Sequence, residues 1–188
     1  MTARPSMLNE IKYPLAIRLL HVFRAVLILG LIVSGLSMVG RSEGDALAAI
    51  MYPTHKKFGV LIWLLAAVHV ALRWHYRALM PHSVETRAIW ERRLAHGVHW
   101  LLIGLTLVTP LMGYAMSTTL PGGDGVPFLS LARLPEFLPK SDVAFSTFQA
   151  LHRYSAYVLL ACIVLHVAGA LKHRLMDRNG DDVLARMF

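Results

Sequence analysis

Two histidines, His152 and His166, stand fourteen residues apart in the last long apolar stretch of the chain. Fourteen residues make roughly four helical turns, so both rings leave one face of a helix. At a rise of about 1.5 Å per residue they lie roughly 21 Å apart, which is most of a bilayer core of about 30 Å. Imidazole is an iron ligand, and ionisable groups inside a membrane are costly unless they have a function. The pair therefore indicates two haems, one in each leaflet.

The composition supports a membrane setting for these histidines. The chain has 188 residues, of which 56% are hydrophobic, and a mean hydropathy of +0.52. Four stretches are long and apolar enough to span a bilayer, at about 15–39, 55–74, 94–118 and 148–173. We therefore expect an all-α membrane protein, with residues 1–188 forming a single four-helix bundle domain.

The net charge of +8 is explained by topology rather than by nucleic-acid binding. With four spans both termini lie on one side, and 13 of the 19 lysines and arginines fall on that side. The positive-inside rule then places both termini in the cytoplasm. We expect a lipid bilayer as partner and no nucleic acid.

Helix boundaries follow from the polar and proline residues between the spans. Pro53 and Thr54 predict the start of the second helix just before His55. The longest connection, 120–147, joins the third and fourth spans on the outer side. Its apolar segment from Phe128 is interrupted by prolines and is typical of a stretch lying over the bundle.

The outer histidines pair by topology alone. His55 and His152 are the histidines near the outer ends of the second and fourth spans, and both helices descend from that side. A haem at this level would take both rings as axial ligands. The alternative is that each caps a helix or lies among lipid headgroups.

The inner partner of His166 is left open by spacing. His69 lies fourteen residues after His55, so the second span repeats the spacing of the fourth. His21 on the first span lies at a similar depth. The full set of inner candidates is His21, His69, His96, His99 and His173. Of these, His96 and His99 are three residues apart, where they would either orient a propionate or a quinone or act as polar anchors.

Motifs over nearly the whole chain identify a resemblance. The chain resembles the bacterial cytochrome b561 family of four-helix, di-haem inner-membrane proteins. The matching segments are Tyr13, Ile17-Arg-Leu-Leu-His21, His55-Lys-Lys-Phe-Gly59, Leu94-Ala-His96-Gly-Val-His99, Pro110-Leu-Met-Gly-Tyr114, His152, His166-Val-Ala-Gly-Ala-Leu-Lys-His173 and the closing run 177–187. Val22 departs from the tryptophan that often follows the first-helix histidine, and a ligand role for His69 would be a second departure.

The resemblance implies two haem b groups. His21 and His166 would bind the inner haem iron, and His55 and His152 the outer haem iron. It also implies an oxidoreductase that takes electrons from periplasmic superoxide, or another small reductant, and reduces ubiquinone in the membrane. His173, two turns beyond His166, would then donate a proton at a quinone site.

Two other functions remain open at this stage. One is a haem b membrane subunit that passes electrons between quinone and a partner dehydrogenase or other redox protein. The other is a membrane transporter or scaffold without redox chemistry, whose histidines titrate. Two axial imidazoles leave no open position on iron, which favours electron transfer over oxygen binding.

Overall fold

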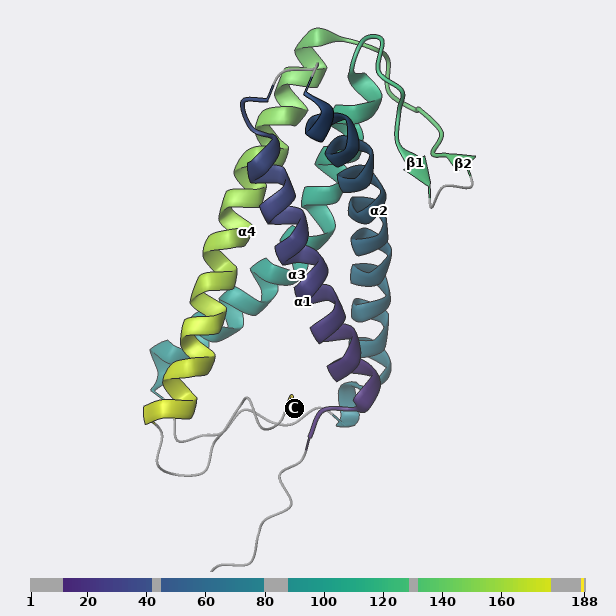
Figure 1. Ribbon diagram of the computed structural model, residues 1–188. Coiled ribbons are helices and arrows are strands. Elements are labelled where there is room, and N and C mark those ends of the chain that lie inside the picture. Colours follow the sequence, from purple (N-terminus) through teal and green to yellow (C-terminus); the bar gives the residue numbers. More distant parts are fainter. Residues whose placement is uncertain (1–11, 42–44, 80–87, 129–131, 177–186, 188) are drawn as a thin grey trace, which may run out of the picture.

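The computed structural model describes residues 12–41, 45–79, 88–128, 132–176 and 187. Four long helices form an antiparallel bundle: α1 (Leu15–Met38), α2 (Ala46–His75), α3 (Ile89–Thr119) and α4 (Asp142–Met176), as Figure 1 shows. A short 3₁₀ turn, η1 (Arg77–Leu79), follows α2. All four helices are long and apolar enough to cross a membrane, which confirms the predicted all-α class with four spans.

The outward faces of the helices are apolar, as lipid contact requires. Leu19 and Val26 on α1 are 63% and 65% exposed, and Trp74 on α2 is 73% exposed. In a soluble domain such an array of exposed large side chains would be an aggregation hazard. In a bilayer these side chains are solvated by acyl chains, so the exposed surface supports the membrane assignment.

Three helices begin earlier than predicted, and α3 starts at Ile89, five residues before the predicted start. α2 starts at Ala46 and α4 at Asp142, nine and six residues before the predicted starts. Pro53 lies inside α2, and the helix begins instead at Asp45, whose side chain accepts hydrogen bonds from the amides of Leu47 and Ala48. The hydrogen bond from Arg41 lowers the pKa of the Asp45 carboxyl group below its usual value. The Asp45 carboxylate at the start of α2 therefore keeps its charge at neutral pH.

The helices pack closely in only some combinations. The close backbone pairs are α3 with α4, α1 with α2, and α2 with α3, whereas other helix pairs in the described residues have at most sparse backbone contact. In Figure 1 the lower ends of α1 and α2 stand apart from those of α3 and α4. Side chains, rather than backbones, therefore meet between α4 and the first two helices.

The connection between α3 and α4 forms a small cap at one end of the bundle. Strands β1 (Pro127–Phe128) and β2 (Ala132–Arg133) pair antiparallel, beside the end of the bundle where α3 finishes (Figure 1). β1 contacts α2, so the strands form a hairpin beside the bundle rather than the predicted single segment lying over it (Figure 1). The cap covers the end that carries His55 and His152.

Candidate functional site

The outer histidines face one another across the bundle. His55 on α2 and His152 on α4 have ring centres 6.2 Å apart. An iron with imidazole nitrogens about 2 Å away on both sides, each about 1.1 Å from its ring centre, separates the centres by about 6.3 Å. The observed separation therefore matches two axial ligands of one haem.

Hydrogen bonds orient both outer rings for metal binding. The Nδ1–H of His152 donates to the carbonyl oxygen of Thr109 at 2.9 Å. Ser34 donates its hydroxyl to the carbonyl of Leu31, so its oxygen accepts from His55 Nδ1 at 2.8 Å. With both Nδ1 atoms acting as donors, each Nε2 keeps its lone pair for a metal.

Each outer ring also packs against a glycine. A methyl group at Gly113 on α3 would lie 3.0 Å from Cε1 of His152, and one at Gly35 on α1 would lie 3.4 Å from Cε1 of His55. The close approach of α3 to α4 thus depends on a missing side chain at Gly113.

We predict that Gly113→Ala weakens binding at the outer site. The added methyl displaces the His152 ring, and overpacking of this kind costs about 1–3 kcal/mol, or about five- to a hundredfold in affinity. The measurement is haem per protein by pyridine haemochrome. Gly104→Ala on the same helix is the matched control, because a methyl there meets nothing within 4 Å. Equal haem content in both variants would contradict the prediction.

A large cavity adjoins the outer ring pair. It has a volume of about 580 Å³, and both His55 and His152 line it. Among its charged lining residues are Lys56, Arg153 and Arg41, and the described lining contains no carboxylate. Arg41 is paired with Asp45 at 2.6 Å, which leaves Lys56 and Arg153 as cations with no carboxylate bound among the described residues. The cavity is therefore apolar around the rings and positive at its outer end.

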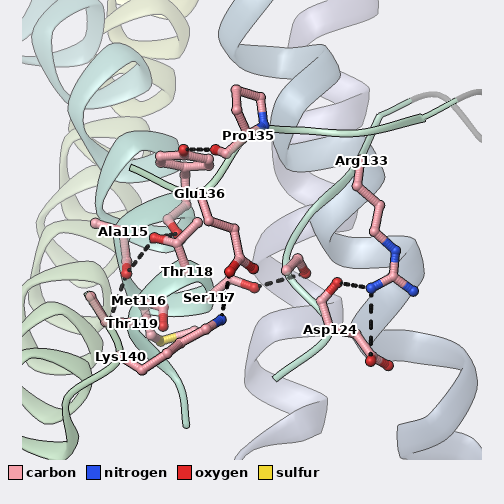
Figure 2. Close-up of polar contacts among 12 residues, drawn as sticks. Ala115, Met116, Ser117, Thr118, Thr119, Asp124, Arg133, Pro135, Glu136 and Lys140 are labelled. Carbon is pink, nitrogen blue, oxygen red and sulfur yellow. Dashed lines mark hydrogen bonds and ion pairs between the residues drawn. The ribbon is translucent and has the colours of Figure 1, made fainter. Parts of the chain in front are cut away.

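The cap holds itself in place over this cavity by polar contacts. Figure 2 shows Ser117 at the end of α3, whose hydroxyl donates to the Gly125 carbonyl at 3.0 Å. The same carbonyl accepts from Lys56 at 3.1 Å, and Gly125 has a φ of 70° that favours glycine. Glu136 is paired with Lys140 at 2.8 Å, and Arg133 is paired with Asp124 at 3.8 Å (Figure 2). These acids of the described cap are thus paired with cations of the cap itself, and no ion pair joins them to Lys56 or Arg153.

The inner ring of His166 has two histidine neighbours. The ring centre of His21 on α1 lies 6.1 Å away, and that of His99 on α3 lies 5.2 Å away. The first separation matches an intervening iron by the same arithmetic, whereas the second is about 1 Å too short. His21 Nδ1 is buried without a hydrogen-bond partner in the described structure.

The other predicted inner candidates have different surroundings. His69 is buried, with 6% exposure, but it makes no ring contact with His166 among the described residues. His96 Nε2 accepts a hydrogen bond from Trp100 Nε1 at 2.8 Å, so that lone pair is used. His173 lies half-exposed near the end of α4. The structure thus brings His21, and not His69, to His166.

These residues suit haem better than a bare metal ion. Within the described residues no group of three His, Cys, Asp or Glu side chains converges as an ion site would require. Two facing histidines at each of two levels are arranged as the two axial ligands of a haem iron would be. Along the continuous helix α4 the two levels are about 21 Å apart. The geometry defines a four-helix membrane protein whose bundle holds two pairs of facing histidines at two levels.

Comparison with known proteins shows to which family of membrane proteins the chain belongs. The family model described as prokaryotic cytochrome b561 matches residues 12–188. Cytochrome b561 homolog 2 of Escherichia coli (strain K12) is 26% identical over 168 residues, which cover 89% of this chain and 86% of that protein. The chain belongs to the prokaryotic cytochrome b561 family. It is accordingly a haem b protein of membrane electron transfer, with several spans in the bacterial inner membrane.

Sequence reasoning missed several residues that support the rings. Thr109 and Ser34 carry no pattern that marks them as acceptors, and Gly113 was noted only as part of a family motif. Arg24 on α1 is buried inside the bundle with 8% exposure. Its position ten residues into a 24-residue apolar helix is the signal that marks it as buried.

Proposed function

We propose that the chain binds two haem b groups and carries electrons across the inner membrane from periplasmic superoxide to ubiquinone. The observation that carries the proposal is the pair of ring separations, 6.1 Å for His21 with His166 and 6.2 Å for His55 with His152. The first pair would hold the inner haem iron and the second the outer one. Both termini would be cytoplasmic, as the charge distribution predicts.

The haems would supply reversible one-electron chemistry, and the chain supplies their positions and surroundings. Two filled axial positions exclude oxygen as a ligand. The two ring pairs lie on opposite halves of α4, so one site faces each leaflet. Backbone contact between α4 and the first two helices is sparse, and the cavity of about 580 Å³ beside the outer ring pair would take part of a macrocycle at that level.

The outer cavity is the proposed point of superoxide entry. Lys56 and Arg153 line it beside the outer ring pair, and the described lining contains no carboxylate. A positive, low-dielectric opening raises the encounter rate of a small anion. Two superoxide anions would supply two electrons and leave as oxygen, and one ubiquinone would take those electrons with two protons.

The proposed quinone site lies at the inner end of α4. His173 follows His166 by two turns and is half-exposed there, where its imidazole would donate a proton to a bound quinone. Lys172 on the same turn is bonded to Glu91 on α3, which fixes this end of α4 against α3.

The test is quinol formation by the purified chain alone. Superoxide generated enzymatically and a water-soluble ubiquinone analogue should yield quinol well above the background rate, at two superoxide anions per quinol. Superoxide dismutase should abolish the reaction. Two haems that dithionite reduces, but no quinol from superoxide, would overturn the proposed donor and favour a subunit that serves a partner protein. An absorption spectrum without a b-type haem band would overturn the whole proposal.

A further inference from the structure

Arg24 is a buried cation inside the membrane-spanning part of α1. It lies one turn beyond His21 and is 8% exposed. One guanidinium nitrogen, Nη2, donates to the hydroxyl of Thr106 on α3 at 3.0 Å. Its Nε is buried without a partner in the described structure. Nine residues separate it from the start of α1, which places it about 13 Å along the helix.

No carboxylate compensates this charge among the described residues. The ion pairs there join Arg41 with Asp45, Arg133 with Asp124, Lys140 with Glu136 and Lys172 with Glu91, all toward the ends of the bundle. An arginine keeps its charge in proteins, and an unpaired charge inside a membrane is costly. An arginine retained at such a place is a default candidate for a functional role.

The inner and outer sites differ in the charge around their histidines. Arg24 is buried one turn from the inner histidine His21, whereas the cations beside the outer pair are half-exposed (Lys56) or exposed (Arg153), so that solvent screens their charge. The outer rings donate their Nδ1–H groups to neutral oxygens, which increases the basicity of the ligands and stabilises ferric iron. His21 Nδ1 has no such acceptor. Both differences favour the reduced state at the inner site relative to the outer site.

We propose that Arg24 raises the midpoint potential of the inner haem above that of the outer haem, so that electrons move downhill from the outer site to the inner site. This inference rests on the haem positions of the proposed function. The physical reason is that reduction removes one positive charge from the haem iron, and a nearby fixed cation in a low dielectric stabilises the less positive state. Arg24 acts through this field and does not ligate iron.

The test is a potentiometric titration of the full chain with both haems, following the reduced haem band. The wild type should show two midpoints. Arg24→Gln and Arg24→Met should shift the higher midpoint downward and leave the lower one in place, whereas Arg24→Lys should retain most of the wild-type value. Arg18→Gln is the matched control, because Arg18 is also three residues from His21 but half-exposed, where water screens its charge. A His55→Ala background, which leaves the inner haem alone, should show the same downward shift.

Two results would overturn the inference. One is an unchanged higher midpoint in both neutral variants with two haems bound. The other is loss of the inner haem in both neutral variants, because Arg24 would then hold the cofactor rather than tune it. Failure of the proposed function would give a different result. The wild-type protein itself would then lack two haems, or His55→Ala would remove neither haem.

Discussion

His21→Ala is expected to lower the haem content of the purified protein from two per chain to one, while His69→Ala retains two. The ring of His21 lies 6.1 Å from that of His166, the separation that an intervening iron requires, whereas His69 makes no such contact among the described residues. Pyridine haemochrome analysis of equal amounts of folded protein measures the difference. One haem in the His69 variant together with two in the His21 variant would reverse the assignment of the inner ligand.

His99→Ala is the matched control for this comparison. Its ring is the nearer neighbour of His166, at 5.2 Å, but that separation is too short for an iron between two imidazoles. We therefore expect two haems in the His99 variant, with altered packing beside His166. The remaining haem of the His21 variant should still be reduced by an outer donor, but electrons should no longer cross to quinone, because the inner site is empty.

Helical spacing alone predicts much of the arrangement of the histidines in the bundle. His152 and His166 lie on one continuous helix, α4. The fourteen-residue interval between them therefore places their rings at two different depths along the bundle. α2 runs in the same direction as α4, which brings His55 near the outer end of its helix, and the structure pairs it with His152. Both results depend only on the helical repeat and on an alternating path through the membrane.

The inner partner was not predictable from spacing because it depends on how helices rotate in the bundle. His69 repeats the spacing of α4, yet α2 directs that ring to a buried position away from His166. α1 directs His21 toward α4 although no regular interval links the two helices. Family resemblance, and not periodicity, favours His21 in the sequence, and its ligand role stays a prediction.

The starts of α2 and α4 illustrate a second limit of sequence reasoning. Pro53 lacks an amide hydrogen and such a residue normally ends or bends a helix, so the sequence predicts a helix boundary there. In the structure α2 continues through it, because Asp45 caps the helix two turns earlier and the loss of one backbone bond is tolerated. His55 therefore lies inside the helix rather than at its end. The contacts of the outer histidine rings with Gly113, Gly35 and Ser34 were likewise not predictable from the sequence, since they form between helices that are distant in sequence.

The second large effect is expected at the outer cavity. Neutralising both cations, in the double variant Lys56→Gln with Arg153→Gln, should slow the reduction of the outer haem by superoxide about tenfold at low ionic strength. These two side chains line the cavity beside the outer rings, and no described carboxylate lies with them. Stopped-flow absorbance of the reduced haem band gives the second-order rate constant. The wild-type rate should also fall as salt is added, whereas the variant should depend on salt only weakly.

Arg133→Gln is the matched control for that rate. Arg133 is an outer cation on β2, but it is paired with Asp124 and does not line the cavity. Its removal should leave both the rate and its salt dependence near those of the wild type. Haem content must be equal in all variants, since Lys56 neighbours His55 in sequence and bonds the cap at Gly125. Unchanged rates in the double variant, with both haems present, would show that superoxide reaches the outer haem without electrostatic guidance by this cavity.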